Sequence, residues 1–180
     1  FWNSTLKTTF AELNHQLNAD WNAKVVLTRN EYSNQGTMFY AYGTPEQGSG
    51  LGLFSYPSQY NFLNKQTQID AGISGKFALF GRKNELSFGA NRSRSVVDDV
   101  SHYSADTGTA LPSLENWTGN YPIPNFNAAS DGSHFVYKQQ SVYGSSRLNL
   151  HDQLKLIAGA RFTQAESTGS AYQVDRRSDA

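Results

Sequence analysis

The chain has no cysteine and no excess of either charge. Without cysteine it forms no disulfide, no thiolate zinc site and no cysteine nucleophile. Its 15 Lys and Arg residues balance 15 Asp and Glu residues, so it lacks the cationic excess typical of nucleic-acid-binding proteins and basic membrane-surface modules. The sequence therefore argues against both classes, and we expect no nucleic-acid partner.

Long hydrophobic runs are also absent. No segment approaches the roughly 18 consecutive apolar residues of a membrane-spanning helix, and no basic-then-apolar secretory signal opens the chain. Hydrophobic residues make up only 38% of the sequence, yet 13% of it is aromatic, whereas disordered chains contain few aromatic residues. We therefore expect a folded chain without a large globular core, and a membrane location stays possible.

The dominant periodicity is two. Residues 68–80, 153–163 and 21–28 alternate between apolar and polar side chains, which predicts strands with one apolar face and one polar face. No segment of useful length follows the helical period. We expect six strands, at about residues 4–16, 20–32, 61–80, 84–97, 134–150 and 153–167.

The breaks between these strands come in two sizes. Short polar breaks near 17–20, 81–84 and 151–152 predict tight hairpin turns, whereas 33–60 and 98–133 are long and irregular. Long loops at one edge and short turns at the other are typical of a transmembrane β-barrel, in which the apolar side chains face lipid and the polar ones a wet interior. A soluble antiparallel sandwich alternates in the same way and stays an alternative.

Two segments carry a resemblance to a known family. Residues 76–90 form a strand–turn–strand pattern around Phe80-Gly81-Arg82, and residues 141–162 combine Tyr-x-x-x-Arg-Leu with Leu-x-x-Gly-x-Arg-Phe. Both resemble the hairpins of TonB-dependent ferric-siderophore receptors, especially the ferripyoverdine, coprogen and ferrioxamine type, and residues 11–21 show a weaker similarity. The similar segments cover about a third of the chain and coincide with hairpins that the turn chemistry predicts.

The resemblance implies an all-β antiparallel meander of about six strands, part of a large barrel of roughly 22 strands with a plugged lumen. The long loops would be extracellular and the short turns periplasmic. The chain shows no plug-like domain, TonB box or terminal aromatic strand, so we expect an internal barrel segment that ends within another long loop. The implied location is the outer membrane of a Gram-negative bacterium.

The function that the resemblance implies is binding of a ferric siderophore and its import with TonB energy. The implied partners are the ferric siderophore, the TonB complex acting through the plug domain, and outer-membrane lipid. Iron would arrive inside the siderophore, so no cofactor and no protein ligands for the metal are expected. A soluble β-sandwich module that binds carbohydrate or another ligand, and a passive porin fragment, stay open as alternatives.

Aromatic residues near the long loops are the candidate binding site. The siderophore would be held by Tyr40, Tyr42, Tyr56, Trp117 and Tyr121, although an outer aromatic girdle and loop packing would use the same residue types. Aromatic residues expected beside the short turns, as an interfacial girdle, are Trp2, Trp21, Phe77 and Phe80. The four histidines share no metal-ligand spacing and no Ser/His/Asp arrangement stands in a recognisable context, so neither a metal site nor an enzyme is expected.

Overall fold

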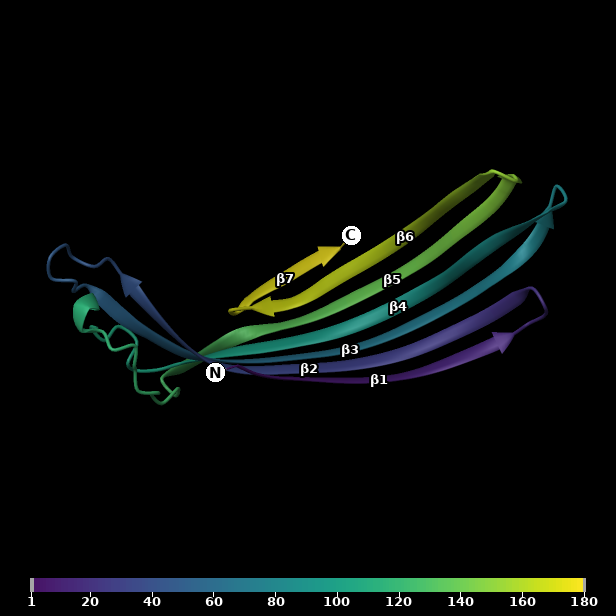
Figure 1. Cartoon of the computed structure of the whole chain (residues 1–180). Coiled ribbons are helices and arrows are strands. Elements are labelled where there is room, and N and C mark those ends of the chain that lie inside the picture. The colour runs from purple at the N-terminus through teal and green to yellow at the C-terminus, as the bar shows by residue number, and fades with distance from the viewer. Residues whose placement is uncertain (1, 180) are drawn as a thin grey trace.

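The computed structural model describes residues 2–179 as one antiparallel sheet of seven strands in chain order (Figure 1). The expected all-β meander is confirmed. The elements are β1 (Trp2–Gln16), β2 (Trp21–Gly43), β3 (Leu53–Leu79), β4 (Arg82–Tyr103), the 3₁₀ turn η1 (Leu114–Asn116), β5 (Ala129–His151), β6 (Leu154–Ala171) and β7 (Val174–Asp179). Among these residues no helix is long and apolar enough to cross a membrane.

The strands run further than the sequence pattern predicts. Residues 33–43 and 53–60 belong to β2 and β3, which pair without interruption as far as Gly43 and Leu53. The expectation of an irregular stretch over 33–60 is therefore wrong, and only 44–52 lies outside the strands. The irregular part of 98–133 shrinks likewise to 104–128. Strands pair through backbone hydrogen bonds, which do not require alternating side chains. The composition of these segments therefore gave no sign that they extend the strands.

A seventh strand replaces the long loop expected at the end of the sequence. Tyr172 and Gln173 have φ of 49° and 66°, and β7 then pairs antiparallel with β6. Two consecutive residues with positive φ form the tight hairpin turn that matches strand twist. The turn lacks the Asn and Gly residues by which such turns are recognised, and so the sequence pattern missed it.

Three short connections lie together at one end of the sheet (Figure 1), at residues 17–20, 80–81 and 152–153. In the first, the side-chain oxygen of Asn18 accepts hydrogen bonds from the backbone N–H groups of Asp20 and Trp21 at 2.9 and 3.0 Å. In the second, Phe80 and Gly81 have φ of 53° and 70°, again the two-residue hairpin geometry. We call this end of the sheet the short-turn end and the other the long-loop end.

The strand register separates the side chains into two faces. Directly paired residues line up across six strands as Leu13, Val25, Ala71, Ala90, Val142 and Phe162. Similar rows form an apolar band that covers residues 71–77 of β3, on the order of 20 Å along the strand. We call this the band face. The opposite face at the same level is polar, with paired Asn22, Ser74, Ser87 and Ser145.

The sheet has no covering layer and no hydrophobic core. Among residues 2–179 only one large hydrophobic side chain is buried, that of Leu111. Phe162 in the apolar band is 74% exposed. A soluble sandwich would bury this band against a second sheet, so the single layer favours the barrel over the sandwich.

Candidate functional site

The tip of the β2–β3 hairpin is held by the segment that follows β4. The pairing of β3 with β4 ends at Ser58 and Tyr103, and residues 108–111 then take the place of β4 along the edge of β3. The Ser55 N–H donates to the carbonyl of Thr109, and the Leu111 N–H donates to that of Leu53, both at 2.9 Å. This pairing satisfies the backbone groups that β4 leaves free, and it fixes the hairpin tip that carries most of the candidate aromatic residues (Figure 1).

Three of the five candidate residues lie together on the face opposite the apolar band. Tyr40 pairs directly with Tyr56, and Tyr42 with Phe54. The Tyr42 and Tyr56 rings meet edge to face, with centroids 6.3 Å apart. Together with Thr107, the three tyrosines line a shallow depression of about 410 Å³. Its aromatic walls stay accessible, since Tyr40 is 55% exposed.

The Tyr56 hydroxyl is a hydrogen-bond donor at neutral pH. Burial raises the pKa of Tyr56 above its usual value, and the neighbouring Tyr103 adds to the effect. A phenol with a raised pKa keeps its proton. The depression therefore offers three ring faces and, at Tyr56, a neutral donor, and its lining contains no acidic or basic side chain.

The other two candidates lie on the opposite side of the hairpin. Trp117 stacks on Phe39 with centroids 5.8 Å apart, and Tyr121 lies 4.4 Å from the same ring. The Tyr121 hydroxyl also donates to the Asp106 carboxylate at 3.4 Å. Phe39 and Tyr40 are neighbours in a strand, so their side chains point to opposite faces. Trp117 and Tyr121 thus pack the 104–128 segment against the hairpin, apart from the tyrosine cluster.

The register adds aromatic residues that sequence reasoning did not assign to the site. Tyr103 lies 6.1 Å from Tyr56, and Phe135 and Tyr137 stack at 5.9 Å further along the sheet. The alternation in β5 could have indicated the last two. Three further aromatic residues on this face connect the tip to the wall through ring contacts at 5.8–6.4 Å: Tyr32, Phe62 and Tyr60. Because they lie opposite the apolar band, they are not an aromatic girdle of the band face.

Of the aromatic residues expected beside the short turns, Trp21 lies there and Trp2 does not. Trp21 lies at that end on the band face, where an added Cβ on its partner Gly75 would come within 2.3 Å of the indole. Trp2 pairs with Gly36 and lies at the long-loop end of β1, so its expected position beside the short turns is wrong. The reason is that β1 runs from Trp2 to Gln16 before it reaches the first short turn, so Trp2 lies at the far end of the strand from that turn.

A polar network joins four strands lower on the same face as the tyrosine cluster. The Tyr143 hydroxyl donates to Asp70 at 2.9 Å, and the Arg161 guanidinium lies 5.9 Å from the Tyr143 ring centroid. Arg161 also donates to Ser141 at 2.7 Å. The ring covers Gly89, where an added Cβ would come within 2.6 Å of the hydroxyl oxygen. The missing side chain at this glycine makes room for the tyrosine.

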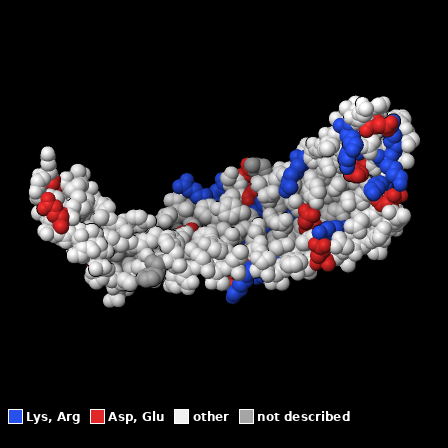
Figure 2. Space-filling model, in the orientation of Figure 1, with Lys and Arg blue, Asp and Glu red and all other residues white. Residues whose placement is uncertain are grey.

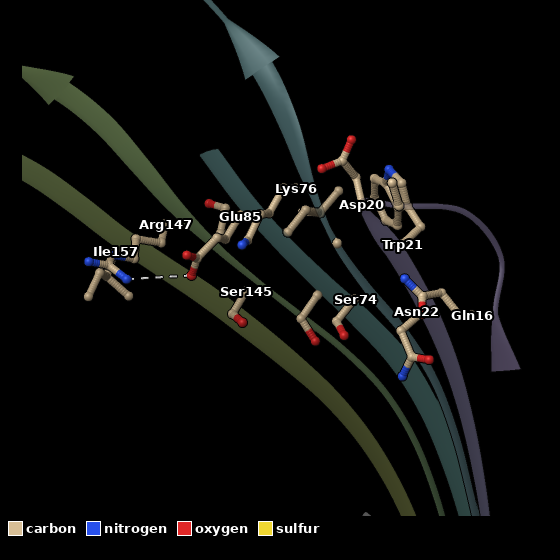
Figure 3. A pocket seen from close by; sticks show the side chains of 15 residues that line it. Gln16, Asp20, Trp21, Asn22, Ser74, Lys76, Glu85, Ser145, Arg147 and Ile157 are labelled. Atoms are coloured by element: carbon tan, nitrogen blue, oxygen red, sulfur yellow. Dashed lines mark ion pairs between the residues drawn. The ribbon is translucent and has the colours of Figure 1, made fainter. Parts of the chain in front are cut away.

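A second polar depression lies at the short-turn end. It measures about 540 Å³ and is lined by mixed polar and charged side chains, among them Lys76, Glu85 and Arg147 (Figure 3). Arg147 and Glu85 form an ion pair at 3.5 Å. Figure 2 shows charged side chains gathered at this end of the molecule and sparse near the hairpin tip. Within residues 2–179 no three acidic or histidine side chains are grouped so as to hold a metal ion.

The fold defines a class of protein. A curved antiparallel meander with short turns at one end, long excursions after β2 and β4 at the other and a one-sided apolar band is a segment of a membrane β-barrel wall. Residues 1–180 match the family model described as TonB dependent receptor-like, beta-barrel. The chain belongs to this family, whose barrels lie in the outer membrane of Gram-negative bacteria.

The relatives in this family include several siderophore receptors. The chain is 34% identical to the ferric-pyoverdine M114 receptor PbuA of a Pseudomonas species over 97% of the chain and 22% of the relative. It is 25% identical to the ferripyoverdine receptor of Pseudomonas aeruginosa over 93% of the chain and 21% of the relative. The chain therefore spans about a fifth of the relatives it matches.

Solved structures show the same fold. The structure of the pyoverdine outer membrane receptor FpvA from P. aeruginosa, bound to pyoverdine, superposes with a TM-score of 0.84 at 24% identity, over 98% of this chain and 25% of that one. BauA, the ferric preacinetobactin receptor of Acinetobacter baumannii, gives 0.78 at 17% identity, over 99% of this chain and 27% of that one. At these identities the likeness concerns the fold alone.

Proposed function

We propose that the protein containing this chain is an outer-membrane receptor that binds a ferric siderophore from outside and imports it with TonB energy. The observation that carries the proposal is the tyrosine cluster at the long-loop end, on the face opposite the apolar band. The curated relatives, which are ferric-pyoverdine receptors, support the same assignment. Receptors of this kind bind and transport their ligand without transforming it, so the protein is not an enzyme.

The geometry of the cluster suits a bulky chelate with a polar surface. Tyr40, Tyr42 and Tyr56 present ring faces for packing and hydroxyls for hydrogen bonding. A cationic chelate would gain about 0.5–2 kcal/mol from each well-placed ring. The siderophore itself would supply all the ligands of the iron, with none from the protein.

The two faces of the sheet then have separate partners. The apolar band contacts the lipid of the outer membrane, because an exposed apolar surface of this size is costly in water. The opposite face lines the lumen, where the polar network around Tyr143 and Arg161 meets water or the plug domain through which TonB acts. A passive porin shares this arrangement of faces, but diffusion through a pore does not require an aromatic cluster that binds a ligand at the mouth of the barrel.

The test uses the full-length protein and ferric pyoverdine as the probe. We expect saturable binding by the purified receptor, and uptake by cells that express it only when TonB is present. Uptake that persists without TonB and does not saturate would instead support a passive pore. Absence of both binding and uptake with several chelates of this class would contradict the receptor assignment.

A further inference from the structure

Above the apolar band, the band face becomes strongly cationic. The three rows of paired residues that follow the Leu13–Phe162 row toward the long-loop end contain six cations and two carboxylates, although the whole chain has no net charge. The carboxylates are Glu31 and Glu166. The cations are Lys7, Arg29, Lys65, Arg92, Arg94 and Lys138. We call these cations the basic belt.

Within residues 2–179, the side chains of the three arginines of the basic belt have no hydrogen-bonding or ion-pair partner. Lys138 pairs with Glu166 at 3.3 Å. The three arginines, Arg29, Arg92 and Arg94, are all exposed. Unpaired arginines on one face are ready to receive an anion, and their planar donor groups suit phosphate.

The register brings these cations close together. Arg94 pairs directly with Lys138 on one side and with Thr67 on the other, and Thr67 pairs with Arg29. Strands lie about 4.8 Å apart, so these three cations span on the order of 15 Å. Arg92 is two residues from Arg94 on the same strand and so lies on the same face, one row nearer the apolar band.

Two adjacent hollows, which share lining residues, lie beside the belt on the band face. The larger, about 610 Å³, is floored by the paired residues Ala71 and Ala90 and walled by Val142 and Phe162. The smaller, about 250 Å³, is lined by Lys138 and Glu166. Both include Arg92, Gln140 and Gln164 in their lining. A mostly apolar groove therefore borders a polar one that contains two cations, Arg92 and Lys138.

The geometry points to a binding site for a single phosphate-bearing membrane lipid. Its acyl chain would lie in the groove over Ala71 and Ala90, and its phosphate would contact Arg92, Arg94 and Lys138. Charge complementarity and the change from apolar to cationic lining at Arg92 both favour an amphiphile over a soluble anion. This site rests on the proposed function, in which the band face contacts the lipid of the outer membrane. It makes that contact selective for lipids that carry phosphate.

The experiment measures lipid binding to the full-length receptor in detergent by native mass spectrometry. The probes are lipid A with two phosphates and the same lipid after dephosphorylation. We expect R92Q/R94Q/K138Q to bind phosphorylated lipid A on the order of 100-fold more weakly at low ionic strength. The reason is that three cations are removed, and each Lys or Arg near an anionic surface raises the affinity about fivefold. The matched control K83Q/K155Q/R176Q removes three exposed cations away from the belt and should bind like the unmodified receptor.

A second variant tests the groove without changing charge. A90F fills the groove from an exposed position, and we expect it to weaken lipid binding about tenfold. Equal binding of the two lipid forms, unchanged binding by R92Q/R94Q/K138Q, or unchanged binding by A90F would each overturn the proposal. Displacement of the lipid by millimolar inorganic phosphate would also overturn it, because the site would then recognise the free anion. Ferric pyoverdine binding, measured on the same samples, reports on the proposed function separately.

Discussion

Neighbouring residues of β2 contact different groups at the hairpin tip. Tyr40 faces the depression that Tyr42 and Tyr56 share, whereas Phe39 faces the other way and receives Trp117 and Tyr121. The pleat of the strand imposes this division, because consecutive side chains point to opposite faces. Mutations at adjacent positions should therefore affect ligand binding and loop packing separately.

The first prediction concerns the tyrosine cluster. In the full-length receptor, Y40A/Y42A/Y56A should weaken ferric-siderophore binding by about 10–100-fold, because three ring contacts are lost. Binding would be measured by titration with ferric pyoverdine, and assembly by the amount of folded receptor in the outer membrane. W21A and F77A are matched controls at the short-turn end and should leave the affinity unchanged. Unchanged affinity after alanine replaces all five residues, Trp117 and Tyr121 included, would place the site elsewhere.

A second prediction at this scale concerns Gly89. A Cβ there would meet the Tyr143 hydroxyl at 2.6 Å and the backbone oxygen of Ala71 at 2.7 Å, so G89A should displace the ring and its bond to Asp70. We expect a loss of about 1–3 kcal/mol in the free energy of unfolding, measured by urea titration of the full-length barrel in micelles. At Gly144 a Cβ would meet nothing closer than 3.5 Å, and G144A is the control. Equal stability of the two variants would contradict the packing of Tyr143 over Gly89.

At the scale of elements, the strands change character along their length. The band face of β2, β3 and β4 is apolar near the short-turn end and becomes basic at Arg29 and Arg92, two strands apart but one row from each other. The opposite face changes from polar to aromatic over the same distance. Each of these three strands therefore crosses the apolar band once and continues beyond it, so the β2–β3 hairpin extends past the band.

The third prediction tests the two faces directly. Spin labels at Ile73, Leu156 and Ala158 of the full-length protein in bilayers should be accessible to oxygen, because these residues share the band face. Labels at Ser74, Lys155 and Gly159 on the opposite face should not. A label at Arg29 should mark the boundary, with lower oxygen accessibility than Ile73. Equal, water-like accessibility at both sets would contradict the barrel orientation.

At the scale of the whole molecule, the described residues form a single-layer sheet with no second layer packed against it. Its exposed hydrophobic side chains have no second layer against which to pack, and the outer edges of β1 and β7 carry no paired strand within residues 2–179. Unpaired edges and large apolar surfaces both promote association. The segment therefore depends on the rest of a barrel and on lipid for its stability.

The fourth prediction follows from this dependence. The isolated 180-residue chain, refolded into plain buffer, should aggregate rather than form a monomer that unfolds cooperatively. Size-exclusion chromatography and urea unfolding followed by circular dichroism would test this. The full-length receptor in detergent is the control and should be monomeric and cooperative. A stable monomeric segment in buffer would show that the sheet folds autonomously and would contradict its assignment to a barrel wall.

The sequence by itself determined the antiparallel meander, the positions of the hairpins at its short-turn end and the apolar parity of residues 68–80. These features are local, because alternation and turn chemistry depend on residues a few positions apart. The family was also readable, from the patterns in 76–90 and 141–162. Six of the seven strands could therefore be expected without a structure, although their long-loop ends could not.

Only the tertiary structure decided which distant residues share a surface. The pairing of β2 with β3 through 33–43, the separation of Tyr40 from Trp117, and the row that joins Arg29 to Lys138 across four strands all depend on register. Register is set by backbone hydrogen bonds between segments far apart in the chain, and a shift of one residue would move every side chain of a strand to the other face. For this reason the alternation along single strands predicted the two faces but not the tyrosine cluster or the basic belt, which form only when the strands are aligned.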